Sequence, residues 1–101
     1  MTVDELAGEY GEPALVMIDV EGYEARVLDG APRTLGNGRT SFLVEIHEEL
    51  VDFGGSADEV IGRFEGFRRF VAVEDDDPLL PLDGSPPSGR FFLLALPAGA
   101  A

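Results

Sequence analysis

The chain has no cysteine and no lysine, so all seven of its basic residues are arginine. Complete absence of lysine is typical of a protein encoded by a GC-rich genome. A halophilic source is a second explanation, since dense surface carboxylates suit high salt. Without cysteine, the chain can form neither a disulfide bond nor a thiolate metal site.

Long apolar runs are also missing. No stretch reaches the roughly 18 consecutive apolar residues of a membrane span, and the N-terminus lacks the basic-plus-apolar pattern of a signal peptide. We therefore predict a cytoplasmic protein with no membrane-bound part.

Positive charge is scarce, because twenty acidic residues face seven arginines and give a net charge of −13. A field of that sign repels phosphate backbones, so we predict no nucleic-acid partner. The 101 residues, 45% of them hydrophobic, suffice for one globular domain. We assign it to residues 1–97, with residues 98–101 as a disordered tail.

What the chain does contain is two apolar strings, residues 15–24 and 42–47, that stop abruptly at acidic residues or histidine. This pattern is typical of a buried parallel strand whose carboxyl end delivers polar groups to a site. In open α/β sheets the ligand crevice lies at those ends. The candidate site residues on this rim are Asp19, Glu21, Glu45 and His47.

The remaining pattern predicts helices alternating with strands. Capping signals and turn residues predict helices over 2–11 and 56–66, and a helix that follows the Glu21-Gly22 step and runs to about Asp29. They also predict strands over 14–20, 41–47, 70–73 and 90–96, and a loop over 78–89. Such alternation favours a mainly parallel sheet with flanking helices. The last two strands are joined without a helix, which favours an antiparallel pair. We therefore predict an α/β fold with about four strands, the last one antiparallel.

Asp19 and Glu21 are two positions apart, and so are Glu45 and His47. Each pair therefore lies on one side of an extended chain. Three carboxylates and an imidazole suit a hard cation such as Mg²⁺ or Mn²⁺. They also suit a general base, because crowded carboxylates raise one another's pKa. In a purely structural alternative, Glu21 or Glu45 caps a helix and His47 satisfies buried backbone groups. The spacing leaves these interpretations open.

The two strings resemble the C-terminal half of the FkbM-type methyltransferases. The matching segments are Ile18-Asp19-Val20-Glu21-Gly22-Tyr23-Glu24, Val27-Leu28-x-Gly30-Ala31 (where x is any residue) and Leu43-Val44-Glu45-Ile46-His47. The resemblance covers about residues 2–97. It implies a partial Rossmann-like methyltransferase fold, S-adenosylmethionine as methyl donor, and a small-molecule hydroxyl group as the acceptor in an O-directed reaction.

The resemblance also implies roles for the rim residues. Asp19 would lie near the methionine end of the donor and near the acceptor, with Glu45 and His47 on the acceptor side. His47 or Asp19 would take the acceptor's proton, and Glu21 or Glu45 would orient that base.

In the family, a glycine-rich turn and an acidic residue that grip the donor precede the matching blocks. Gly36-Asn37-Gly38 follows a helix and does not replace that turn. We therefore expect this chain alone to bind no S-adenosylmethionine and to be inactive.

Two further expectations concern the sheet. With the family's first three strands absent, we predict the spatial order one, two, four, three. Strand 14–20 then becomes an edge, and an exposed apolar edge invites pairing with another chain. We therefore predict self-association through this strand, as an edge-to-edge dimer. In the alternative function, the chain is a truncated methyltransferase-like fold that serves as a binding or oligomerisation module without catalysis.

Overall fold

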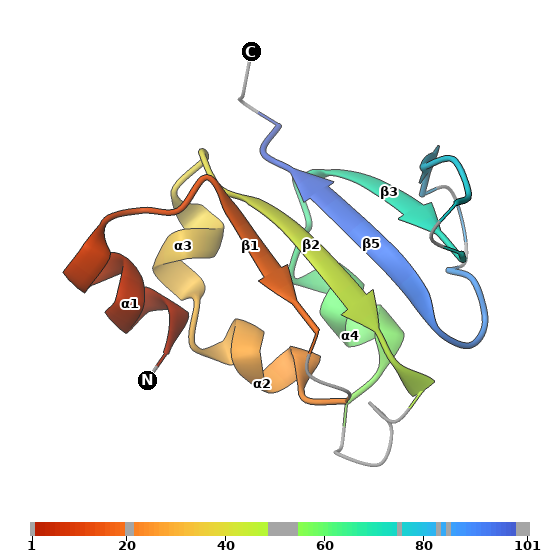
Figure 1. Cartoon of the computed structure of the whole chain (residues 1–101), viewed down its shortest axis with the longest axis horizontal. Helices are drawn as coiled ribbons and strands as arrows, with labels where there is room; N and C mark the ends of the chain where they lie inside the picture. The colour runs from red at the N-terminus through yellow and green to blue at the C-terminus, as the bar shows by residue number, and fades with distance from the viewer. Residues whose placement is uncertain are drawn as a thin grey trace.

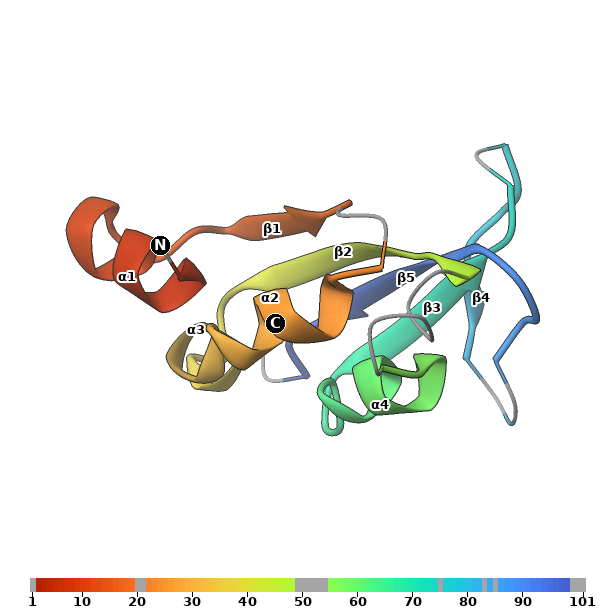
Figure 2. The ribbon, with the colours of Figure 1, turned by 90° about the horizontal axis from the view of Figure 1, so that it is seen from below.

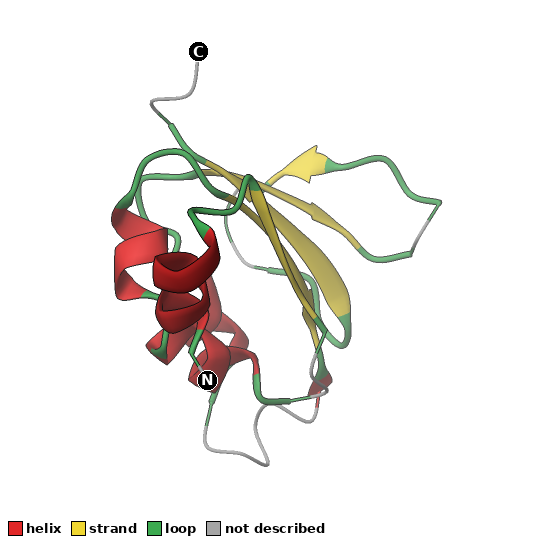
Figure 3. Cartoon of the chain, turned by 60° about the vertical axis from the view of Figure 1, so that its left-hand side comes forward, coloured by secondary structure: helices red, strands yellow, loops and turns green. Residues whose placement is uncertain are grey.

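The computed structural model describes residues 2–19, 22–48, 55–74, 76–82, 84 and 86–98. Its helices are α1 (Val3–Tyr10), α2 (Glu24–Asp29), α3 (Pro32–Gly36) and α4 (Ala57–Gly62). Its strands are β1 (Leu15–Ile18), β2 (Ser41–Ile46), β3 (Arg68–Ala72), β4 (Leu80–Pro81) and β5 (Phe91–Leu96). The helices of the described residues all lie on one side of the sheet (Figures 2 and 3).

The sheet has the order β1-β2-β5-β3-β4. β1 runs parallel to β2, and β5 runs antiparallel to both β2 and β3, as Figure 1 shows. This confirms the α/β fold and the predicted order of the four main strands, including the antiparallel last strand.

One boundary prediction is wrong, because the expected loop over 78–89 contains the two-residue strand β4. Its residues pair with β3, Pro81 opposite Phe70 and Leu80 opposite Val71. A proline is tolerated in an edge strand because its missing N–H is not needed on the outer side. The proline-rich composition therefore concealed a short edge strand.

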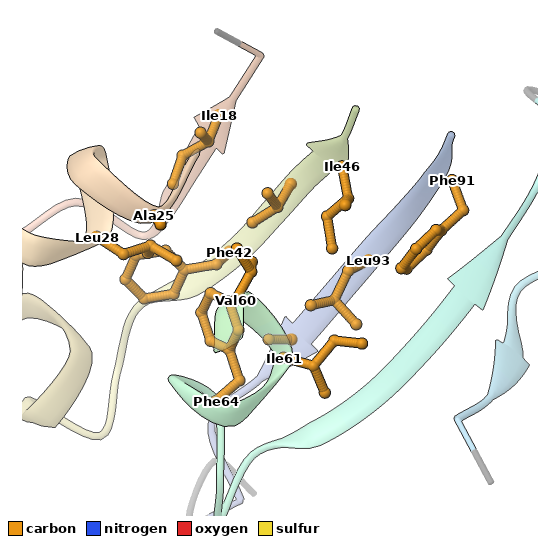
Figure 4. Close-up of a cluster of buried hydrophobic side chains, with 12 residues drawn as sticks. Ile18, Ala25, Leu28, Phe42, Ile46, Val60, Ile61, Phe64, Phe91 and Leu93 are labelled. Atoms are coloured by element: carbon orange, nitrogen blue, oxygen red, sulfur yellow. The ribbon is translucent and has the colours of Figure 1, made fainter. Parts of the chain in front are cut away.

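The core lies between the sheet and the helices, and it follows from the alternation of side chains along β2 and β5. Phe42 of β2 points toward the helices, where its ring lies 5.2 Å from that of Phe64; the ring of Phe64 lies 5.4 Å from that of Phe67. Leu28 of α2 and Val60 of α4 are fully buried beside them (Figure 4). These contacts fix the helices beneath the strands that carry the site.

The first helix begins with the predicted capping box. The hydroxyl of Thr2 accepts a hydrogen bond from the backbone N–H of Glu5 at 3.1 Å, and the Glu5 carboxylate accepts one from the N–H of Thr2 at 3.2 Å. Asp4, in the same turn, caps the start of α3, accepting the N–H of Arg33 at 2.8 Å and that of Thr34 at 2.9 Å. α3 has no side-chain cap of its own, so α1 completes it from a distance.

The second helix begins at Glu24, two residues after the glycine of the predicted turn from strand to helix. Gly22 precedes it with φ of 109°, a conformation that favours glycine and turns the chain from β1 into the helix. Val20, Glu21 and residues 99–101 lie outside the described residues. The predictions that concern Glu21 and most of the tail therefore have no structural outcome.

β1 is an edge strand, as predicted. On the sheet face opposite the helices, the pairing register aligns Met17, Leu43, Leu94 and Phe70 in one apolar row. Met17 is 70% exposed at the end of that row. No helix among the described residues is long and apolar enough to cross a membrane.

Candidate active site

The parallel pairing of β1 and β2 brings polar residues together where both strands end. Ile18 lies beside Val44 in the register, so the next residues, Asp19 and Glu45, follow side by side. The two strands end on the same edge because they run in the same direction (Figure 1). The sheet itself therefore positions the first two acids of the site.

His47 follows β2 and lies against both acids. Its Nε2 atom is 3.3 Å from Oδ1 of Asp19 and 3.6 Å from Oε2 of Glu45. The side chain of His47 is 10% exposed, that of Glu45 14% and that of Asp19 67%. The structure thus brings three of the four predicted site residues together around Nε2, while Glu21 lies outside the described residues.

A fourth acid, Glu24, holds the other side of the imidazole. Its side chain is fully buried, and Oε1 lies 2.8 Å from Nδ1 of His47 and accepts the backbone N–H of Gly22 at 3.0 Å. We did not predict Glu24 as a site residue. A signal was present, because Glu24 precedes the predicted core residue Leu28 by four positions and therefore shares its helix face.

Arg90 was also missed. Its Nη1 atom lies 3.1 Å from Oε1 of Glu45, the oxygen that faces away from His47. Arg90 directly precedes β5, which pairs with β2 across the sheet. No local pattern could have indicated this contact, since it depends on the pairing of strands that are distant in the sequence.

The surroundings of His47 change its affinity for a proton. Burial by itself lowers the pKa of His47. The hydrogen bond to Glu24 and the negative charges of Glu24, Glu45 and Asp19 together outweigh it, so the pKa is raised. A ring with a raised pKa is a stronger base, which suits it to accept a proton at Nε2.

Glu45 also holds a proton more tightly than an ordinary glutamate. Burial, a hydrogen bond with Asp19 and the charge of Asp19 raise the pKa of Glu45, while His47 and Arg90 act in the opposite direction. The cluster therefore favours a bound proton at two points, the imidazole ring of His47 and the carboxyl group of Glu45.

Asp19, Glu45 and His47 also offer three ligand atoms that lie within 4.8 Å of one another. Such a set is close enough for one hard cation of the Mg²⁺ or Mn²⁺ type. A proton on His47 and the guanidinium of Arg90 also balance the negative charge of this cluster, without a metal ion. Metal binding therefore stays a prediction.

The sequence profile of the methyltransferase FkbM domain matches residues 1–74, more than half of the chain. The chain belongs to the FkbM methyltransferase family. No curated protein matches it, and no solved structure matches it. The match includes the ends of β1 and β2, so Asp19, Glu45 and His47 all lie within this FkbM domain.

FkbM methyltransferases generally use S-adenosylmethionine, and the hollows near the site can be compared with the size of that molecule. The hollow that touches Asp19 and Glu45 has a volume of about 80 Å³, below the roughly 300 Å³ at which cofactor pockets begin. A groove of about 400 Å³ between α1 and β1 has an apolar lining, including Leu6 and Val16, and offers no charged side chain for an amino acid or a ribose. Neither of these two hollows of the FkbM chain fits the whole donor, and the absence of donor binding stays a prediction.

Proposed function

We propose that the chain forms the acceptor side of an S-adenosylmethionine-dependent methyltransferase that methylates a hydroxyl group of a small molecule. One observation carries the proposal. His47 has Nδ1 held 2.8 Å from a buried carboxylate and Nε2 directed at the two rim acids. This is the arrangement of an oriented general base at the open carboxyl end of two parallel strands.

Methylation of a hydroxyl group requires that its proton leave as its oxygen attacks. We assign Nε2 of His47 as the acceptor of that proton, which general-base catalysis makes worth about 10² to 10⁴ in rate. The imidazolium that results is stabilised by Glu24, Glu45 and Asp19. Asp19 is the other candidate base, but its side chain is 67% exposed and that of His47 only 10%, so the imidazole is held far more firmly.

The charge of the rim limits the acceptor. Asp19 and Glu45 face the opening, and Arg90 is directed at Glu45. An anionic acceptor would approach two carboxylates at short range and lose Coulomb energy. The proposal is therefore for a neutral or cationic hydroxyl compound.

In this proposal the donor is held mainly by groups outside the described residues, and the small hollow at Asp19 supports this. We expect calorimetry to detect no binding of S-adenosylmethionine to this chain alone, and labelled donor to give no product with it. Micromolar binding would contradict this expectation and would place a donor site within the chain.

The function itself is tested in a chimera, in which the donor-binding half of an active FkbM methyltransferase precedes this chain. Transfer of a labelled methyl group to a set of neutral polyols is expected, with a loss of at least about 100-fold in His47→Gln and no loss in the matched control Glu9→Gln. A folded chimera that binds the donor and transfers no methyl group, or transfers it equally well without His47, would contradict the proposal.

The free edge of β1 favours a second candidate function, association without catalysis. The hydrogen bond from the N–H of Ser41 to the carbonyl of Ala14, at 2.9 Å, sets which β1 residues face β2. The alternation of the ladder then turns the N–H and C=O groups of Leu15 and Met17 toward the outer edge. Both side chains are substantially exposed beside the apolar groove.

Light scattering tests this association. We expect wild-type chain to form a dimer at high concentration and Met17→Lys to remain monomeric, because a lysine blocks an edge strand. Leu79→Lys, an exposed residue away from β1, is the matched control and should still dimerise. A wild-type monomer at high concentration would contradict this function.

A further inference from the structure

The buried acid Glu24 is the one charged side chain of the described residues that is fully enclosed in the protein. We propose that Glu24 is a positioning residue, which holds His47 with its proton on Nδ1 and stabilises the imidazolium that forms when Nε2 accepts a proton. The inference rests on the proposed function in one respect, because the proposed function supplies the hydroxyl group whose proton Nε2 accepts. The geometry of the pair stands on its own.

The contact fixes the tautomer of the ring. A carboxylate oxygen can only accept a hydrogen bond, so the 2.8 Å contact between Oε1 and Nδ1 requires that Nδ1 carry the proton. The same oxygen accepts the N–H of Gly22 at 3.0 Å, which holds the carboxylate in place. The lone pair of Nε2 is then left on the side of Asp19 and Glu45, toward the opening.

The second oxygen of Glu24 shows that charge, and not only hydrogen bonding, is involved. Oε2 is buried and has no hydrogen-bond partner among the described residues. Burying an unsatisfied charged oxygen costs free energy. A glutamine would accept the Nδ1–H just as well without a buried charge. The carboxylate adds only one thing, a negative charge beside the ring, which is useful when the ring becomes positive.

The proton transfer then balances without involving Glu24 as an acceptor. The O–H bond of the acceptor breaks, a bond between Nε2 and that proton forms, and the electron pair stays on the acceptor oxygen. Nδ1 keeps its own proton and its bond to Glu24. The ring gains one positive charge, which lies next to the carboxylate of Glu24 and faces Asp19 and Glu45.

Nitrogen-15 NMR of the imidazole tests the proposal directly, since His47 is the sole histidine of the chain. In the wild type at high pH, the neutral ring is expected to carry its proton on Nδ1. In Glu24→Gln this tautomer should persist, because the amide oxygen still accepts, while the pKa of His47 falls. In Glu24→Met both the tautomer preference and the raised pKa should be lost. Glu9→Gln, an exposed acid on α1, is the control that should change neither.

Two results would overturn the inference. One is a wild-type neutral ring with its proton on Nε2. This NMR measurement needs no variant, so it stays decisive even where a substitution prevents folding. The other is a His47 pKa that does not respond to Glu24→Gln. Failure of the methyl-transfer chimera is a separate outcome, because it would refute the proposed function and leave the tautomer and pKa measurements intact.

Discussion

The guanidinium of Arg90 lies 3.1 Å from Oε1 of Glu45 and thereby holds that carboxylate with its other oxygen toward His47. The contact joins two different strands of the sheet, because Arg90 directly precedes β5 and Glu45 belongs to β2. Glu45 is thus the link between the surface cation and the imidazole ring. Its removal should affect His47 in a defined direction.

Replacing Glu45 by glutamine is expected to lower the pKa of His47, because one of the three negative charges that favour the imidazolium disappears. Asp19→Asn should lower it too, and by less, since the influence of Asp19 is the smaller of the two. NMR titration of the ring protons measures both shifts. An unchanged titration curve in both variants would remove the rim acids from the electrostatics of the site.

The pH dependence of stability follows from the same ring. The pKa of His47 is raised in the folded chain above its ordinary value of 6.5. The stabilising contribution is therefore fully present below that value and is lost as the pH rises through the folded pKa. Urea denaturation between about pH 5.5 and about pH 9 should show wild type losing stability relative to His47→Gln. Parallel curves for the two proteins would contradict the prediction.

The cap that Asp4 provides for α3 gives the opposite pH dependence. Burial acts to raise the pKa of Asp4, but the hydrogen bonds from Arg33 and Thr34 outweigh it and lower the pKa. Its contribution is therefore present above the ordinary value of 3.8 and is lost as the pH falls through the folded pKa. Asp4→Ala should melt at a lower temperature than wild type at neutral pH. The difference should shrink in acid, and a constant difference would show that the charge is not involved.

The end of α2 lies so close to the start of α1 that position 30 requires a glycine. A Cβ atom at Gly30 would lie 2.8 Å from Cβ of Thr2, which is too close for any real contact. Gly30→Ala should therefore destabilise the fold by about 1–3 kcal/mol in urea denaturation. Gly62→Ala, with open space around its Cβ position, is the control and should be neutral or stabilising by about 0.4–1 kcal/mol. Equal effects of the two substitutions would refute the contact.

Local signals were sufficient for most of the elements. The capping box at Thr2 and the serine at Ser56 each lie where a helix begins, because a side-chain oxygen and a backbone N–H three residues away are enough to start one. Local signals failed at β4, whose two residues form a strand only because β3 offers a partner. They did locate the turn from β1 into α2, where Gly22 has a positive φ and the helix begins at Glu24.

The sequence by itself determined that Asp19, Glu45 and His47 would lie at the carboxyl ends of neighbouring strands, because apolar runs that end in polar residues predict parallel strands with a common rim. Only the tertiary structure decided what surrounds the imidazole. Glu24 reaches Nδ1 from a helix and Arg90 reaches Glu45 from the start of a distant strand. Contacts of this kind depend on how layers pack and strands pair, and those arrangements bring together residues that share no local pattern.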